Sequence, residues 1–314
     1  MDIVNTLGSL LPPQSDPRAD NYPLMTSVTP TVLITLCYVF GVCAWSKSLN
    51  LRKFKADGIR KPADNKLQWD LTRCLMIFYN FAMVLYSAVL VCTALYYARK
   101  LNYGLGCVEA PDPTDRQTDV VVAIGYAFYF SKFIEMLDTV FFLWRGRTDQ
   151  VTFLHVFHHA AMPPSIWWGV KYAPGGIVYT FLVANSLIHV IMYTYYGMAA
   201  AGLYRYLWWK NYLTIAQMIQ FVFLICHQSQ IFLSSKPCNY PKIFPAAIMF
   251  YSTVFLILFG NFYVQAYWRK QRLAKHHVKS TTSDKPEANG HIVQNGTVTN
   301  GHVGTSVRER KKRV

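Results

Sequence analysis

Residues 172–204 read YAPGGIVYTFLVANSLIHVIMYTYYGMAAAGLY, and no charged side chain interrupts them. A helix needs roughly 20 mainly apolar residues to cross the hydrocarbon core of a bilayer, so this stretch predicts a transmembrane helix. Further uncharged stretches run over 21–46, 74–98, 211–235 and 243–268. Only 15% of the chain is charged, against about 25% in soluble domains. The predicted fold class is therefore an all-α polytopic membrane protein.

Two more apolar segments contain ionisable residues and bring the predicted number of spans to seven. Residues 117–144 hold Lys132, Glu135 and Asp138, and residues 151–170 hold the run LHVFHH, with His155, His158 and His159. Ionisable side chains inside a bilayer are costly, and they usually mark a functional site. We therefore expect this protein to perform chemistry, or to bind a metal, within the membrane.

The placement of the net charge of +15 predicts the orientation of the spans. Basic residues gather in 47–66, in the tail after 268, and in the connections after the third and fifth spans, which hold Arg145, Arg147, Arg205 and Lys210. The positive-inside rule makes these regions cytosolic and puts the N-terminus and the 101–119 loop on the other side. Because topology accounts for the basic charge, no nucleic acid partner is expected.

The chain is expected to contain three parts. Residues 1–22 form a non-cytosolic N-terminal segment, 23–268 a seven-helix membrane domain, and 269–314 a disordered basic cytosolic tail. The start of the chain, MDIVN, has no basic n-region before an apolar core, so it does not form a signal peptide and the first span is predicted to be an uncleaved anchor. The chain ends with lysines at positions 311 and 312, an arrangement similar to the dilysine retrieval signal of endoplasmic reticulum membrane proteins; an ordinary solvated tail is the alternative.

Two cysteines fall in loops that the topology places on the same non-cytosolic side. These are Cys107 and Cys238, whereas the other five lie within spans. The non-cytosolic side of the secretory pathway is oxidising, so a Cys107–Cys238 disulfide is predicted.

Polar residues recur at steps of three and four along four spans, which places each set on one helix face. Counting about 1.5 Å per residue from the helix ends puts all four sets in the cytosolic half of the bilayer. We therefore expect them to line one cavity that opens to the cytosol. The four sets are Lys132, Glu135, Asp138 and Thr139; His155, His158 and His159; Asn185, His189, Met192, Tyr193 and Tyr196; and Thr214, Gln217 and Gln220.

Several of these residues also have an ordinary structural interpretation. Lys132 and Glu135 would form an internal ion pair, the two glutamines would join helices by hydrogen bonds, and the tyrosines would pack. The histidine run fits such an interpretation poorly.

Two chemistries suit clustered histidines. A di-iron centre of the kind found in membrane desaturases and hydroxylases needs roughly eight histidines, more than the five in the membrane domain, although Glu135 and Asp138 could substitute. Alternatively, a neutral imidazole can attack a thioester and pass the acyl group on without a metal. A seven-helix receptor, the non-enzyme alternative, does not explain polar residues buried on the cytosolic side.

The stretches KFIEMLDT (132–139), HVFHH (155–159), NSLIHVIMYTYY (185–196) and TIAQMIQ (214–220) resemble, in order and spacing, the four signature boxes of the elongases of very long chain fatty acids. This resemblance implies seven helices, six of them in an inverted barrel around an acyl tunnel. It also implies the condensation of a long-chain acyl-CoA with malonyl-CoA to a 3-oxoacyl-CoA two carbons longer. The stretch WWGVK (167–171) looks most like the branch that takes saturated and mono-unsaturated chains.

Within this resemblance we expect a histidine-linked acyl intermediate and no cofactor. The expected catalytic residues are His158, His189, His155, His159 and Asn185. The expected substrate-binding residues are Lys132, Glu135, Asp138, Tyr193, Tyr196, Gln217, Gln220, Arg145, Arg147 and Lys210. The expected partners are acyl-CoA, malonyl-CoA, membrane lipid, the reductases and dehydratase of the elongation cycle, and further copies or relatives in an oligomer. A cysteine nucleophile is disfavoured, because spans three to five contain none.

Overall fold

The computed structural model describes residues 14–56, 71–235 and 238–269, and every regular element within those ranges is helical. The chain divides into two units, Met1–Ala266 and Tyr267–Val314, and the first holds everything discussed below. Most of the expected tail, including Lys311 and Lys312, lies outside the described residues.

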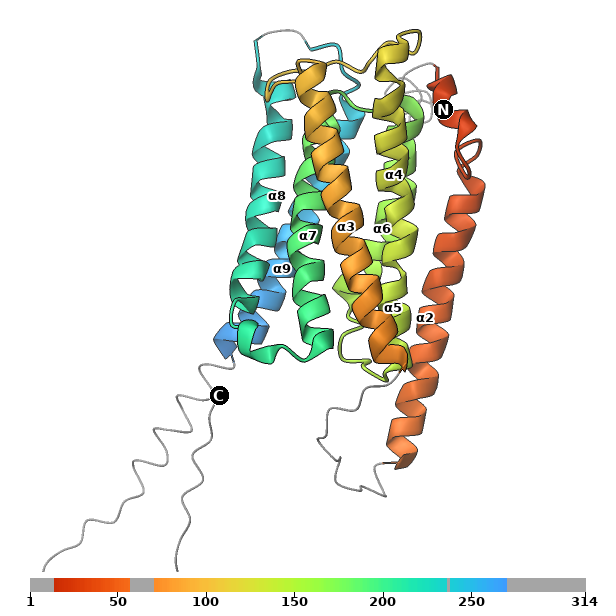
Figure 1. Cartoon of the computed structure of the whole chain (residues 1–314), viewed down its shortest axis with the longest axis vertical. Coiled ribbons are helices and arrows are strands. Elements are labelled where there is room, and N and C mark those ends of the chain that lie inside the picture. Colours follow the sequence, from red (N-terminus) through yellow and green to blue (C-terminus); the bar gives the residue numbers. More distant parts are fainter. Residues whose placement is uncertain (1–13, 57–70, 236–237, 270–314) are drawn as a thin grey trace, which may run out of the picture. The chain divides into compact units, whose positions relative to one another are not determined.

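The described residues of the first unit form eight α-helices (Figure 1). They are α2 (Thr29–Ala56), α3 (Leu71–Lys100), α4 (Asp119–Glu135), α5 (Leu137–Trp144), α6 (Phe153–Tyr172), α7 (Tyr179–Ala201), α8 (Lys210–Leu233) and α9 (Ile243–Tyr263). The short 3-10 helices are η1 (Pro17–Asn21), η2 (Arg116–Thr118), η3 (Gly176–Val178) and η4 (Tyr204–Tyr206), and a π-helical turn, η5 (Val264–Arg269), follows α9.

Six helical segments of the described chain are long and apolar enough to cross a membrane. They are Thr29–Leu51, Leu71–Lys100, Arg116–Trp144, Gly176–Ala201, Lys210–Leu233 and Ile243–Ala266. The third of them is interrupted at Met136, where α4 ends and α5 begins. The histidine segment, the expected seventh span, forms α6 and is not among the six, because three histidines and two prolines make it less apolar.

The helices pack in pairs that bring distant parts of the sequence together. The most extensive contacts join α3 to α7 and α8 to α9, and α6 packs against both α4 and α2. The main core cluster lies between α4 and α6 and includes Phe128, Tyr129, Met162 and Trp167. Large apolar side chains elsewhere are exposed, among them Phe78 on α3. Such extensive apolar exposure is the surface expected against lipid.

One end of the bundle, here called the disulfide end, is closed by connected loops. Cys107 and Cys238 form a disulfide there, with a Cα–Cα distance of 5.8 Å, as the sequence analysis expects. The Ile177 amide donates to the Val108 carbonyl at 2.8 Å, which ties the loop before α4 to the start of α7. The opposite end, where α8 begins, is called the Lys210 end.

The N-terminal segment packs onto the disulfide end, which the sequence analysis did not anticipate. Arg18 donates to Thr118 Oγ1 at 2.7 Å, just before α4. Lys171 of α6 forms an ion pair with Asp20, and Trp167 Nε1 donates to the Leu24 carbonyl at 2.9 Å. The segment therefore fixes α4 and α6 relative to each other at this end.

Candidate active site

The histidine run occupies the first turns of α6. Thr152 begins the helix, since its hydroxyl accepts the backbone N–H of His155 at 3.3 Å. The ring of His159 lies 4.5 Å from that of His155 and 5.3 Å from that of His158. His159 is buried, and because its ring contacts both other imidazoles, the three rings form one cluster within the bundle.

Glu135, the last residue of α4, is the centre of a buried polar cluster. Its Oε1 accepts Lys132 Nζ at 2.6 Å and Ser131 Oγ at 3.0 Å on its own helix. It also lies 3.2 Å from His189 Nδ1 on α7. Only 1% of the Glu135 side chain is exposed, and all three partners lie on Oε1, whereas Oε2 is buried without a hydrogen-bond partner among the described residues.

The cluster sets the orientation of two side chains on α7. A carboxylate can only accept, so the hydrogen between His189 and Glu135 lies on His189 Nδ1, and the lone pair of that imidazole is on Nε2. Lys132 Nζ also lies 3.0 Å from Asn185 Oδ1. An ammonium can only donate, so the oxygen of the Asn185 amide faces Lys132 and its NH₂ faces away.

His158 completes a three-residue group across α4, α6 and α7. One nitrogen or oxygen from each of Glu135, His158 and His189 lies within 4.8 Å of the others. These three groups can take the roles of a nucleophilic triad. His158 would be the nucleophile, His189 the base beside it, and Glu135 the group that orients the base. The expected meeting of His158 with His189 is therefore present in the geometry.

His155 belongs to a separate hydrogen-bonded chain. Its Nε2 lies 2.8 Å from Thr139 Oγ1 on α5, and that hydroxyl lies 2.8 Å from the Tyr38 hydroxyl on α2. This chain fixes the His155 ring beside His159. Tyr38 was not predicted as a site residue from the sequence, because one tyrosine within an apolar span carries no distinguishing signal.

Asp138 and the two expected tyrosines lie in another buried cluster. The Tyr193 hydroxyl donates to Asp138 Oδ2 at 2.8 Å, and the Tyr193 ring contacts those of Tyr79 and Tyr196. These residues support α7 behind His189, whose ring lies 5.7 Å from that of Tyr193. None of them lines the cavity described next.

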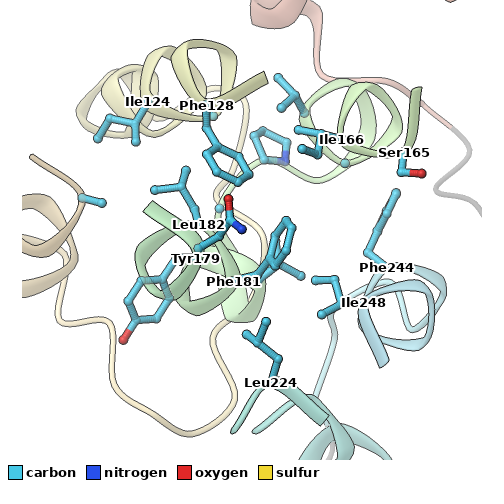
Figure 2. A pocket seen from close by; sticks show the side chains of 18 of the residues that line it. Ile124, Phe128, Ser165, Ile166, Tyr179, Phe181, Leu182, Leu224, Phe244 and Ile248 are labelled. Carbon is cyan, nitrogen blue, oxygen red and sulfur yellow. The ribbon is translucent and has the colours of Figure 1, made fainter. Parts of the chain in front are cut away.

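A long cavity extends from His158 toward the disulfide end, and His155, His159 and His189 are not among its lining residues. It is lined by α3, α4, α6, α7, α8 and α9, and nearly all of its walls are apolar. Figure 2 shows Phe128 of α4, Phe181 and Leu182 of α7, and Leu224 of α8 around it. The lining on α6 runs from His158 to Val170, roughly 18 Å of helix.

The two ends of the cavity differ in chemistry. His158, Asn185 and Gln220 line the polar end. Tyr103 and Gly175 lie at the other, near the disulfide. A Cβ on Gly175 would come within 2.3 Å of Val121 Cγ1, so the walls are closely packed there.

The other expected substrate-binding residues lie away from this cavity. Gln217 Nε2 points to Met192 Sδ at 3.8 Å, while Gln220 reaches the cavity one turn later on α8. Arg145, Arg147 and Lys210 are exposed at the end of α5 and the start of α8. Arg147 pairs with Asp149 at 3.2 Å. These cations surround the Lys210 end and do not contact the histidines.

Residues 23–275 match the model of the family described as ELO: GNS1/SUR4 family. The chain is 39% identical over 286 residues to very long chain fatty acid elongase 7 of Drosophila melanogaster, which covers 90% of this chain and 81% of that protein. It is 39% identical over 282 residues to elongase 1 of Homo sapiens (88% and 94%) and 34% identical over 291 residues to elongase 2 of Mus musculus (91% and 90%).

Proposed function

Because this chain belongs to the GNS1/SUR4 family, we propose that it is a very-long-chain 3-oxoacyl-CoA synthase. In this reaction a long-chain acyl-CoA and malonyl-CoA give a 3-oxoacyl-CoA two carbons longer, with release of CoA and carbon dioxide. The similar proteins from fly, human and mouse are all named very long chain fatty acid elongases.

The observation that carries the proposal is the position of His158. It belongs to the Glu135–His158–His189 group and also lines the apolar cavity. A fatty acyl chain in that cavity would bring its thioester carbon to an imidazole that has a second imidazole within reach. Holding the reactants in this way is worth several orders of magnitude in rate.

In the first half-reaction, a nitrogen lone pair of His158 attacks the thioester carbon. The tetrahedral intermediate collapses, the carbon–sulfur bond breaks, and CoA leaves as a thiolate that takes up a proton. The acylated His158 ring loses its other N–H proton to Nε2 of His189. Glu135 stabilises the resulting imidazolium, because His189 Nδ1 lies 3.2 Å from its carboxylate.

In the second half-reaction, malonyl-CoA enters after CoA has left. Loss of carbon dioxide leaves an enolate, whose α-carbon attacks the acyl carbon on His158. The carbon–nitrogen bond breaks, and the proton held by His189 returns to the departing imidazole. His155 is fixed by its hydrogen bonds through Thr139 to Tyr38, and its ring supports the neighbouring ring of His159 beside His158.

The CoA portions of both substrates would bind at the Lys210 end. Their phosphates need cations, and Arg145, Arg147 and Lys210 are exposed there. We further propose that the Lys210 end faces the cytosol and the disulfide end faces the lumen of the endoplasmic reticulum. The oxidised Cys107–Cys238 pair supports this orientation, since disulfides persist in the lumen.

We also propose that seven helices cross the membrane and that six of them form an inverted barrel around the cavity. The support is that α6 is 20 residues long and lines the same cavity as α3, α4, α7, α8 and α9. The cavity then shields the less apolar residues of α6 from lipid.

A metal-dependent oxygenase is the second candidate, because the Glu135–His158–His189 group could hold one ion. The donor set fits a resident cation poorly, since the Lys132 ammonium, 2.6 Å from Glu135 Oε1, already neutralises the one carboxylate of the group. Metal analysis of purified protein distinguishes the two candidates. Stoichiometric iron would favour the oxygenase.

The function is tested by incubating purified protein with radiolabelled malonyl-CoA and a panel of acyl-CoAs. We expect label in products two carbons longer than each accepted substrate, and none with His158→Ala. His227→Ala is a matched control, because His227 lies on α8 outside the cavity lining. Absence of labelled product from the unaltered protein would refute the proposal.

A further inference from the structure

Two amide side chains at the polar end of the cavity have no role in the mechanism so far. Asn185 on α7 and Gln220 on α8 line the cavity together with His158. Both are more than nine-tenths buried. Buried amides normally find hydrogen-bond partners, so an unused donor at this position needs an explanation.

Gln220 has such an unused donor. Its Nε2 is buried without a hydrogen-bond partner among the described residues. The next residue, Phe221, contacts the ring of Phe255 at 5.9 Å, and the His158 ring contacts that same ring at 5.1 Å. Gln220 therefore lies at the level of His158 in the bundle.

Asn185 presents its donor because its acceptor is already occupied. Lys132 holds Asn185 Oδ1 at 3.0 Å, so Nδ2 is on the opposite side of the amide and donates to no described residue. Lys132 itself is held by Glu135 at 2.6 Å. The ion pair thus positions an amide as well as an imidazole.

We propose that Asn185 Nδ2 and Gln220 Nε2 form the donor pair that binds the carbonyl oxygen of the acyl thioester. The inference rests on the proposed function and adds a catalytic role for Gln220 and a positioning role for Lys132. When His158 attacks, the carbonyl oxygen gains negative charge, and two fixed N–H donors stabilise it. In a cavity with apolar walls, such donors contribute more than they would in water.

This assignment changes the expected roles of three residues. Lys132, expected from the sequence to contact substrate, acts through Asn185 and Glu135. Gln217 and Gln220 were expected to act alike, but Gln217 faces Met192 and Gln220 faces the cavity.

The first test uses Gln220→Met, an apolar side chain of similar length, and Gln217→Met as the matched control. CoA release from acyl-CoA alone is followed in a single turnover. Removing one such donor costs about 10²–10³-fold in rate, so we expect Gln220→Met to be at least tenfold slower, with the binding constant for acyl-CoA within about threefold. Gln217→Met should retain the original rate. A loss below tenfold at position 220 overturns the inference.

The second test reads the carbonyl directly and does not depend on turnover. Acyl-CoA carrying ¹³C at the thioester carbon is bound to His158→Ala protein, and its C=O stretch is measured by isotope-edited infrared spectroscopy. We expect a shift to lower wavenumber on binding, and a smaller shift when Gln220→Met is added, because Asn185 Nδ2 then remains as the only donor of the pair. A shift that is undiminished by the second substitution overturns the inference.

If Gln220→Met does not fold, Gln220→Asn replaces it. This variant keeps the amide, but its shorter side chain holds the NH₂ farther from the carbonyl oxygen of the thioester. Both the rate and the infrared shift should then decrease, and unchanged values overturn the inference. Failure of the proposed function is distinguishable, because the unaltered protein would then transfer no label from malonyl-CoA.

Discussion

Glu135→Gln tests whether the carboxylate at the end of α4 supports the chemistry. Gln has the same shape, so the substitution removes the charge and leaves the packing. Glu135 Oε1 accepts three hydrogen bonds, from Ser131, Lys132 and His189. The contact that matters for rate is the one to His189, because that ring gains a positive charge when it takes the proton from His158.

The magnitude follows from the geometry. Unit charges separated by the 3.2 Å between His189 Nδ1 and Glu135 Oε1 attract by about 5 kcal/mol at an effective dielectric constant of about 20. A neutral amide oxygen retains part of this as an ordinary hydrogen bond. If about half is lost, acyl transfer slows by about 10²-fold, since each 1.36 kcal/mol is a factor of ten.

The assay is single-turnover release of CoA thiol from acyl-CoA, with a thermal unfolding curve for each variant. Ser131→Ala is the matched control, because it removes a different hydrogen bond from the same oxygen and should slow the reaction far less. In a His189→Ala background Glu135→Gln should have little further effect, as coupled residues are not additive. A Glu135→Gln protein that releases CoA at the original rate would refute this reasoning.

Three further predictions concern the cavity and the disulfide end. Cys107→Ser should lower stability by about 2–4 kcal/mol, and reducing agent should lower the melting temperature of the unaltered protein but not of this variant. Gly175→Ala should destabilise by about 1–3 kcal/mol, because Gly175 has φ +76° and its Cβ would meet Val121; adding Val121→Ala should restore part of the melting temperature, and no recovery would contradict the contact. Ala98→Phe places a ring in the cavity lining near this end, so gas chromatography should find the longest product shortened by at least one two-carbon step, and an unchanged profile would show that the acyl chain does not reach Ala98.

Much of the site could be predicted from residue spacing. Steps of three and four placed Glu135 with Lys132, and Asn185 with His189, on single helix faces, and depth counting placed those faces at similar levels. The structure joins them through the Lys132–Asn185 and His189–Glu135 contacts. Helix periodicity and rise are geometric constants, so they transfer to a single sequence without knowledge of the fold.

What could not be predicted depends on how helices rotate and bend against one another. The interruption at Met136 separates Glu135 on α4 from Asp138 on α5. The two carboxylates therefore enter different clusters, although their spacing alone puts them on one face. Likewise, Gln217 and Gln220 share a stripe, yet only Gln220 reaches the cavity. The docking of Arg18 and Asp20 onto the disulfide end is a long-range contact that no local pattern encodes.

The most direct test of the central claim is the trapping of the acyl group on the protein. Purified protein is mixed with acyl-CoA alone, quenched in acid, digested and analysed by mass spectrometry. We predict that the peptide containing His158 gains the mass of the acyl group less one hydrogen, and that subsequent malonyl-CoA removes it. An acyl group that is found on another residue, or that forms equally well in His158→Ala protein, would contradict the account.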